Sequence, residues 1–342
     1  MGHNGPNRHS NKLIAGGLNN TLQLVWRDNS CAVVEPAAVF IRLFVQSGDA
    51  EEPPATNLTL SAAQQAIVTW EISRRGWGPK LYGGFAGGRL EEYIDSHTLT
   101  AEESTHANVS RAVARSYARL HSIRLPLRRD AFRRVVQDFS DGARDQREDV
   151  LQALRALEDP VAVQYADSFE HFDWNGELDW VVNLSEQYEC KTTVTHGDSN
   201  YMNVLVRNSP AKDQCPIVLI DYETISYGYR GFDIGGHFIE RMYSYKQADS
   251  QLTGYCIPSA EQQRAFCEAY LQELHVLGEA SGLDTAGQLL VEAAIGQLYQ
   301  LLYTNLMCTV LNEVEVEPVF LSGLLHMMEM YEQLKGEFIR RH

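Results

Sequence analysis

The side chains with the clearest potential for chemistry lie in residues 196–206 and 217–223 of the 342-residue chain. The first segment, HGDSNYMNVLV, places Asp198 in a loop and Asn203 at the start of a predicted strand, and the second, IVLIDYE, places Asp221 at the end of another. If these strands form a hairpin, the three side chains meet at one end of it. Asn203 and Asp221 carry the oxygen atoms that Mg²⁺ binds, and Asp198 could accept a proton from an attacking hydroxyl. The pattern therefore predicts a phosphoryl-transfer site of the kinase type.

Each of these residues also has a simple structural explanation. His-Gly-Asp is a common turn, and an Asp after an apolar strand often serves as a turn residue. The combination of all of them around one hairpin favours the functional interpretation. A metal-dependent hydrolase that uses His196, Asp198, Asp221 and His237 is an alternative, but the sequence contains no HExxH or similar zinc pattern.

Two further segments could bind phosphate. Residues 14–21, IAGGLNNT, form a glycine-containing turn before a strand, and the backbone N–H groups of such a turn can approach phosphate closely. Arg42 lies inside the apolar run VFIRLFV. A cation there requires an anionic partner, or an edge position from which its side chain reaches water.

The elements that must position these residues differ between the two parts of the chain. Up to residue 94 the sequence predicts strands near 22–26 and 38–45, a helix over 62–75 with Ser61 as its N-cap, and a hairpin of residues 80–85 and 89–94. Beyond it, strands are expected at 204–206 and 217–220, and helices at 101–122, 130–157, 177–189, 260–277, 286–312 and 320–340. We therefore predict an α+β fold with a flexible N-terminal tail (1–12), a small β-rich N-terminal lobe (13–94) and a larger, mostly helical C-terminal lobe (95–342).

The composition limits the function. There are 29 Lys and Arg residues against 45 Asp and Glu residues, a net charge of −16, which argues against a general nucleic-acid binder and against docking on anionic membranes. No cysteine pair has CxxC spacing, and the first residues lack the apolar region of a secretory signal. The most apolar long stretch, 288–311, contains Gln297, Gln300 and Asn305, so it is expected to be a core helix rather than a membrane span. We expect a soluble, reduced, cytoplasmic protein.

Two motifs resemble a known group of kinases. Residues 196–206 resemble the phosphotransferase loop shared by aminoglycoside and choline kinases, and residues 217–240, IVLIDYETISYGYRGFDIGGHFIE, resemble the signature of the choline/ethanolamine kinase family. Residues 78–83, 88–91 and 120–121 are similar to that family too. The resemblance implies a bilobal protein-kinase-like fold. It also implies phosphorylation of ethanolamine, choline or both by ATP with Mg²⁺, the first step of phospholipid head-group synthesis (Kennedy pathway). The partner would be a small amino alcohol, without nucleic acid or membrane insertion, and the family includes homodimers.

The resemblance also implies roles for individual residues, carried over by position. Asp198 is similar to the catalytic base, which touches the substrate, and Asn203 and Asp221 are similar to the metal ligands, with Glu223 assisting. The residues similar to the ATP site are Gly16, Gly17, Leu18, Asn19 and Asn20 in the phosphate loop, Arg42, and Glu92, Tyr93 and Ile94 at the adenine. The residues similar to the amino-alcohol pocket are Glu240, Tyr245 and Tyr303, and a carboxylate with aromatic faces suits an ammonium group. Structural roles are implied for His196, Arg230 and Asp233, and core packing is expected for Tyr227, Tyr229 and Phe232.

The sequence departs from the family pattern at several positions. Gln65 stands where the family has a helix Glu that pairs with the strand cation; an amide could hydrogen-bond Arg42 but would not neutralise it. Tyr303 and Leu306 stand where the family has two Trp residues, and Thr224 stands where an aromatic residue is frequent. Since each cation–π contact contributes roughly 0.5–2 kcal/mol, these changes favour ethanolamine or a relaxed preference.

Two other functions fit parts of the sequence. One is another small-molecule kinase of the same fold, similar to an aminoglycoside phosphotransferase; residues 217–240 argue against it. The other is a non-catalytic, nucleotide-binding pseudokinase, an interpretation that Gln65 motivates. The presence of Asp198, Asn203 and Asp221 argues against the pseudokinase, because a scaffold needs none of them.

Overall fold

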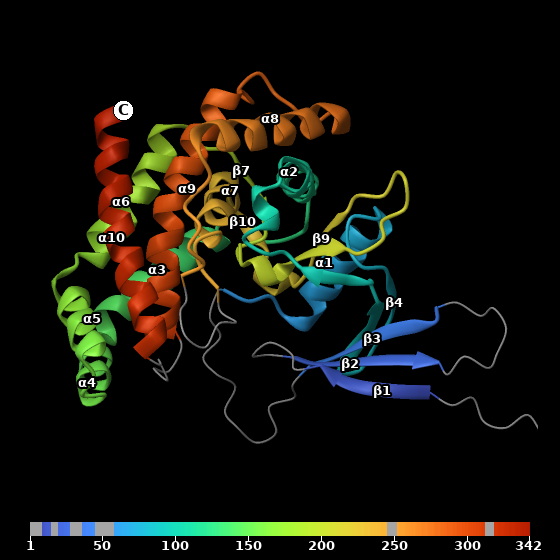
Figure 1. Cartoon of the computed structure of the whole chain (residues 1–342), viewed down its shortest axis with the longest axis horizontal. Coiled ribbons are helices and arrows are strands. Elements are labelled where there is room, and N and C mark those ends of the chain that lie inside the picture. Colours follow the sequence, from blue (N-terminus) through green and yellow to red (C-terminus); the bar gives the residue numbers. More distant parts are fainter. Residues whose placement is uncertain (1–8, 15–19, 28–35, 45–57, 245–251, 312–317) are drawn as a thin grey trace, which may run out of the picture.

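The computed structural model describes residues 9–14, 20–27, 36–44, 58–244, 252–311 and 318–342. Its N-terminal part is an antiparallel sheet in the order β1-β2-β3-β5-β4, made of β1 (His9–Ile14), β2 (Asn20–Arg27), β3 (Ala38–Phe44), β4 (Leu81–Phe85) and β5 (Gly88–Glu92). Figure 1 shows this sheet at one end of the molecule and most of the helices at the other. The predicted strands are confirmed, but β1 begins at His9, inside the segment 1–12 that was expected to be a tail.

The helix of the N-terminal part, α1 (Ala62–Arg74), has the start that its sequence predicts. Ser61 forms a capping box with Gln64: the Ser61 hydroxyl accepts a hydrogen bond from the Gln64 backbone N–H at 3.4 Å, and the Gln64 side chain accepts one from the Ser61 N–H at 3.0 Å. The helix ends before Gly76, whose φ of 66° is in the left-handed region. Val68 and Ile72 are buried and fix which face of α1 packs inward.

The C-terminal part consists mainly of helices, so the predicted combination of a small β-rich part and a larger helical part is confirmed. They are α2 (Ala107–His121), α3 (Ala131–Asp145), α4 (Arg147–Ala156), α5 (Pro160–His171), α6 (Trp174–Gln187), α7 (Arg230–Glu240), α8 (Ala260–Leu277), α9 (Ala286–Leu306) and α10 (Pro318–Arg341). None of the helices in the described ranges has an apolar stretch long enough to cross a bilayer. The stretch 288–311 is instead α9 and the π-turn Met307–Leu311 that continues it, and most of α9 is buried.

Helix α7 lies against α9 at the centre of the C-terminal part. Every residue of α7 is buried. A Cβ atom on Gly296 of α9 would collide with the backbone of Gly231 in α7, and a Cβ on Gly235 would collide with the backbone of α9. The glycines therefore allow the two helix backbones to approach closely. Helix α7 also contacts the loop that precedes β8, because Asp233 accepts hydrogen bonds from the N–H groups of His196 and Gly197.

Two small sheets carry the loops that contain Asp198 and Asp221. Strands β6 (Ser96–Thr98), β8 (Val204–Arg207) and β9 (Ile217–Leu219) form one antiparallel sheet in that order, and β7 (Thr192–Thr195) pairs with β10 (Ser226–Tyr229) in the other. Short helical turns flank them at η1 (Glu103–Thr105), η2 (Tyr201–Asn203) and η3 (Tyr222–Thr224).

Several elements differ from the sequence-based expectation. Helices α5 and α7 and strands β6, β7 and β10 were not predicted, residues 101–122 divide into η1 and α2, and residues 130–157 divide into α3 and α4. Helix α7 contains three glycines, which lower helix propensity, although Arg230, Asp233, His237 and Glu240 recur at helical spacing. The signal for α5 was present: Asp159 accepts hydrogen bonds from the N–H groups of Val161 and Ala162, and Pro160 occupies the first helical position.

Candidate active site

The β8–β9 hairpin brings together the residues that the sequence predicted to meet. Val204 pairs with Leu219 at its base, and the Ile220 N–H donates to the Asn203 carbonyl at 3.0 Å, so Asn203 and Asp221 lie at the same end. The side chain of Asn203 donates from Nδ2 to Oδ2 of Asp198 at 2.7 Å, and the Asn200 N–H donates to Oδ1 of Asp198 at 3.1 Å. Both oxygens of Asp198 are therefore held within the segment that we call the 196–203 loop.

Arg42 reaches this end of the hairpin from the N-terminal sheet. Its Nη1 lies 3.3 Å from Oδ1 of Asp221, and its Nε lies 3.9 Å from Oε1 of Glu91 in β5. Asp221 has a φ of 63°, a left-handed conformation that is uncommon for a residue other than glycine and that occurs at functional turns. Arg42, the cation inside the apolar strand, thus has the anionic partners that a charge in such a position requires.

Gln65 does not make the hydrogen bond to Arg42 that its amide group would allow. Its Oε1 accepts a hydrogen bond from Arg89 at 3.3 Å, and its Nε2 donates to the Leu60 carbonyl at 2.9 Å. Arg89 lies directly opposite Arg42 in the β3–β5 register, and like charges at opposed positions destabilise a sheet. Glu91 pairs with both arginines and offsets this repulsion. In this chain the carboxylate that neutralises Arg42 therefore comes from a strand and not from helix α1.

Asp233 in α7 holds the start of the 196–203 loop. Its carboxylate accepts hydrogen bonds from the N–H of His196 at 2.6 Å, the N–H of Gly197 at 3.0 Å and Nε2 of His121 at 2.9 Å. Burial by itself would raise the pKa of Asp233, but these donors and the neighbouring histidines hold the pKa below its usual value. The carboxylate therefore remains ionised and fixes the loop backbone against α7.

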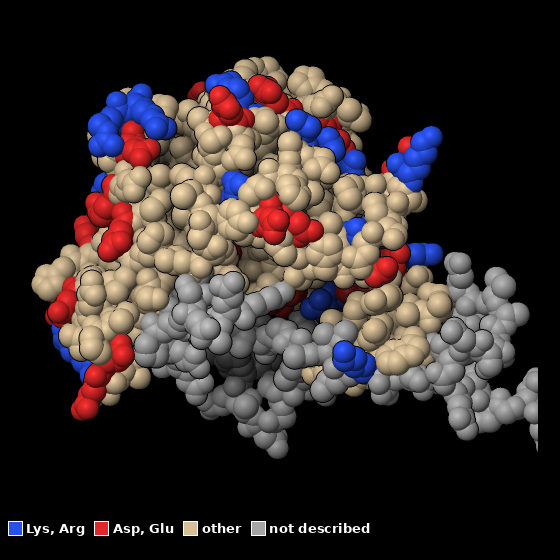
Figure 2. Space-filling model, viewed as in Figure 1, with Lys and Arg blue, Asp and Glu red and all other residues tan. Residues whose placement is uncertain are grey.

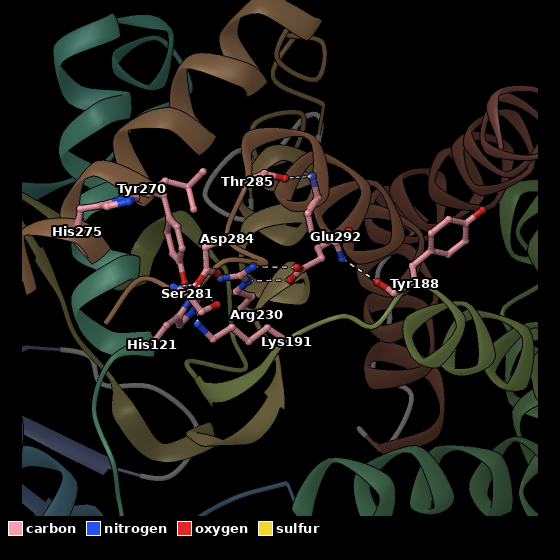
Figure 3. Close-up of polar contacts among 12 residues, drawn as sticks. His121, Tyr188, Lys191, Arg230, Tyr270, His275, Ser281, Asp284, Thr285 and Glu292 are labelled. Atoms are coloured by element: carbon pink, nitrogen blue, oxygen red, sulfur yellow. Dashed lines mark hydrogen bonds and ion pairs between the residues drawn. The ribbon is translucent and has the colours of Figure 1, made fainter. Parts of the chain in front are cut away.

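Arg230 anchors the N-terminal end of the same helix. Its buried guanidinium donates to both oxygens of Glu292 in α9 at 2.8 Å and forms an ion pair with Asp284, and Lys191 lies 3.0 Å from Asp284 (Figure 3). His121, which contacts Asp233, is joined to this cluster through Tyr270: its Nδ1 lies 2.9 Å from the Tyr270 hydroxyl, and the Arg230 guanidinium carbon lies 5.8 Å from the Tyr270 ring centre. This buried network fixes α7, β7 and α9 relative to one another.

A first cavity, with about 510 Å³ of free space including the part open to solvent, lies between the N-terminal sheet and the β8–β9 hairpin. We call it the Arg42 cavity. Apolar side chains of Leu22, Phe40, Ile94 and Leu205 line one part of it, and Arg42, Arg89, Glu91 and Asp221 line the other. Figure 2 shows a hollow with acidic and basic side chains where the N-terminal sheet meets the helical part.

A second cavity, with about 490 Å³ of free space including the part open to solvent, is lined by Gly197, Ser199, Thr224, Phe232, Tyr299 and Tyr303 among others and shares no lining residue with the first. We call it the Tyr303 cavity. Phe232 and Tyr299 stack with ring centres 4.0 Å apart, and Tyr299 lies 5.8 Å from Tyr303. Glu240 is buried near it and accepts a hydrogen bond from Gln300, another lining residue, at 3.2 Å.

Three acidic side chains lie near one another at the hairpin end. Burial, with the negative charges of Asp221 and Asp198, raises the pKa of Glu223 above its usual value. Such mutual repulsion is what a bound cation relieves. Within the described residues no three His, Cys, Asp or Glu side chains form a metal-binding group by themselves, so a metal site here would combine Asp221 and Glu223 with the amide oxygen of Asn203.

The remaining predicted residues fall into three groups. Glu92 and Ile94 line the Arg42 cavity, while Tyr93 is 39% exposed and packs against Phe40. Asn20 begins β2. The others, Gly16, Gly17, Leu18, Asn19 and Tyr245, lie outside the described residues.

Sequence reasoning missed several residues of the two cavities. Phe232, Tyr299 and Gln300 line the Tyr303 cavity, although Phe232 was expected only to pack in the core. Tyr299 and Gln300 lie one turn before Tyr303 in α9, so helical spacing could have identified them. Leu306 is fully buried and does not line the cavity. Glu91 could have been found from its position in the strand opposite Arg42.

Comparisons with known proteins agree with this arrangement. The model of the choline/ethanolamine kinase family matches residues 12–314. A choline/ethanolamine kinase of Mus musculus is 28% identical over 338 residues, covering 95% of this chain and 80% of that protein. The fold resembles the crystal structure of a choline kinase from Cryptosporidium parvum, with a TM-score of 0.68, 17% identity and coverage of 97% and 90% of the two chains. It also resembles a Plasmodium vivax ethanolamine kinase, with a TM-score of 0.61, 17% identity and coverage of 95% and 84%.

Proposed function

This chain belongs to the choline/ethanolamine kinase family and is a kinase, and we propose that it transfers the terminal phosphate of ATP, with Mg²⁺, to the hydroxyl of ethanolamine, choline or both. This would be the first step of phospholipid head-group synthesis, in the cytoplasm. The observation that carries the proposal is that the 196–203 loop contacts the lining of both cavities. Gly197 and Ser199, on either side of Asp198 in the chain, line the Tyr303 cavity. The Asn203 carbonyl accepts a hydrogen bond from the N–H of Ile220, which lines the Arg42 cavity together with Asp221.

The proposed base is Asp198. Its hydrogen bonds from Asn203 and from the Asn200 N–H fix both of its oxygens, so the carboxylate is oriented before the substrate arrives. A carboxylate so placed accepts the proton of the attacking hydroxyl, while the rest of the catalysis of phosphoryl transfer comes from positioning and from charge stabilisation.

The proposed ATP site is the Arg42 cavity. Its apolar part, with Phe40 and Ile94, suits a flat base, and the backbone near Glu92 to Ile94 would meet the adenine edge. Arg42 and the backbone of Gly16 to Asn20 would bind phosphate oxygens. In this chain of net charge −16, such local cations and N–H groups must hold the anionic nucleotide.

Asn203, Asp221 and Glu223 would hold the Mg²⁺. Their amide and carboxylate oxygens are the ligands this ion prefers, and the raised pKa of Glu223 indicates an acidic cluster that a cation would stabilise. When bound, the ion neutralises charge on the phosphates.

The proposed amino-alcohol site is the Tyr303 cavity, with Glu240 and Tyr245. The aromatic faces of Phe232, Tyr299 and Tyr303 and the buried carboxylate of Glu240 suit an ammonium group. Because Thr224 and Leu306 supply no aromatic face, we propose a preference for ethanolamine or little preference between the two alcohols. We also propose that the N-terminal lobe ends near residue 94.

The test is an ADP-release assay with choline, ethanolamine, and mono- and dimethylethanolamine, with kanamycin as the alternative acceptor. We expect turnover with amino alcohols and kcat/KM for ethanolamine at or above that for choline. A strong choline preference contradicts the proposed selectivity alone. Turnover with kanamycin but with no amino alcohol contradicts the proposed function.

A further inference from the structure

A third cavity, with about 510 Å³ of free space including the part open to solvent, shares no lining residue with the two cavities of the proposed active site. It lies where the C-terminal end of α7 meets the start of α2, the start of α8 and the η2 turn. We call it the Arg241 cavity, after the buried arginine that follows α7.

Arg241 is a buried cation without a carboxylate partner. Only 5% of its surface is exposed, its Nε is buried without a hydrogen bond, and its Nη1 donates to the neutral side chain of Gln262 at 3.2 Å. No described carboxylate lies within 4.0 Å of the guanidinium, and the adjacent Glu240 contacts Gln300 instead. Because arginine does not lose its proton in proteins, the charge remains and requires an anion.

The other buried arginines of the described chain show the contrast. Arg230, with 1% of its surface exposed, pairs with Asp284 and Glu292, and Arg89, with 4% exposed, pairs with Glu91. Of these three arginines only Arg241 lacks a carboxylate partner, and it lines a cavity that has room for an anionic group.

His237 adds a second unpartnered polar group to the same cavity. Burial, together with the nearby charge of Arg241, lowers the pKa of His237 to about 3, so the ring is neutral. Its Nδ1 is buried without a hydrogen bond, and the ring lies between Tyr201 at 5.0 Å and Phe266 at 5.5 Å. A neutral imidazole in this position can donate one hydrogen bond to an anion.

The rest of the lining defines the class of ligand. No Asp or Glu lines the cavity, and an exposed Arg111 stands at its edge without an ion pair to any described residue. Phe238 and Phe266, each 1% exposed, form an apolar wall beside Arg241. The lining therefore suits a molecule with one anionic group and an apolar body.

We propose that the Arg241 cavity binds a small organic anion, whose phosphate or carboxylate pairs with Arg241 and whose apolar part packs on Phe238 and Phe266. Tyr201, which lines the cavity, belongs to the 196–203 loop and lies between Asp198 and Asn203 in the chain. The bound anion thus contacts the loop that carries the proposed base.

The test measures binding of phenyl phosphate to the full chain by isothermal titration calorimetry in phosphate-free buffer. Arg241→Met removes the charge and keeps the length of the side chain, and Arg124→Met is the matched control that removes an exposed cation outside the three cavities. We expect saturable binding of phenyl phosphate to the wild type and weaker binding of inorganic phosphate, which lacks the apolar part. We expect a loss of about tenfold or more in Arg241→Met, and no change in Arg124→Met.

Equal binding by the wild type and Arg241→Met, an equal loss in Arg124→Met, or no binding by the wild type would each overturn the proposal. Thermal unfolding without ligand supplies a second measurement. Because Met removes an unpaired buried charge, Arg241→Met should unfold at the same temperature as the wild type or a higher one. A variant that unfolds at a clearly lower temperature, or does not fold, assigns Arg241 a structural role and also overturns the proposal.

Discussion

Replacing Asp233 with Asn removes the charge that holds the start of the 196–203 loop. In the wild type one oxygen of Asp233 accepts from the His196 N–H and from Nε2 of His121, and the other accepts from the Gly197 N–H. The single side-chain oxygen of an Asn can take the place of the oxygen that faces His196 and His121, but its NH₂ group then faces the Gly197 N–H. One hydrogen bond is lost, a buried donor is left without a partner, and two charge-assisted bonds become neutral ones.

The magnitude follows from these contacts. A buried donor without a partner costs about 1–3 kcal/mol, and a neutral hydrogen bond is about half as strong as a charge-assisted one. Together these terms predict that Asp233→Asn lowers the free energy of unfolding by about 3–5 kcal/mol. The Arg42 cavity, where we propose that ATP binds, does not include Asp233, so we expect kcat to fall by about tenfold or more while KM for ATP changes little.

The assay combines urea unfolding with hydrogen exchange of residues 196–203, and Asp213→Asn, at an exposed loop position, is the matched control. We expect faster exchange in this loop and a lower urea midpoint for Asp233→Asn only. A midpoint and loop exchange equal to those of the wild type would refute the idea that Asp233 holds the loop.

The same contacts predict the dependence on pH. Because the folded state lowers the pKa of Asp233 below the unfolded value of about 3.9, its contribution is present above that value and is lost as pH falls through the folded pKa. The difference in stability between wild type and Asp233→Asn should thus be constant from about pH 5 upward and shrink only in more acidic solution. A difference that shrinks between pH 6 and 8, where histidine titrates, would assign the effect to another group.

Three further substitutions test other parts of the site. Arg230→Met leaves two buried carboxylates with only Lys191 nearby, and should lower the free energy of unfolding by about 3–5 kcal/mol in urea titrations; a loss under about 1 kcal/mol speaks against the network. Arg42→Met should raise KM for ATP about tenfold or more without changing KM for the amino alcohol; the opposite pattern contradicts its assignment to phosphate. Gly197→Ala should lower the melting temperature, because Gly197 has a φ of 81° and a Cβ there would lie 2.6 Å from a backbone oxygen; an unchanged melting temperature contradicts this strain.

The sequence was sufficient to predict the hairpin that carries the site. Strong apolar strands on either side of a polar loop fix the β8–β9 pairing, and its register then places Asn203 and Asp221 together. The capping box at Ser61 and the helices that begin and end with clear signals, such as α8, were predictable for the same reason: the information is local.

Contacts between distant segments could not be predicted in this way. The pairing of Glu91 with Arg42 depends on the neighbouring position of β3 and β5, and the cavity residues of α9 depend on how α7 packs against that helix. Helix α7 itself was missed although Arg230, Asp233, His237 and Glu240 recur at helical spacing, because its three glycines lower helix propensity and its close packing on α9 is a contact between distant segments.

The central claim is that Asp198 acts as the base of an ATP-dependent amino-alcohol kinase. The most direct measurement is kcat of Asp198→Asn with ethanolamine and choline, together with ATP affinity measured by calorimetry. We predict that kcat falls by about 10²–10⁴-fold while ATP affinity remains near that of the wild type. A variant that keeps its kcat, or one that loses ATP binding in parallel with activity, would contradict the claim.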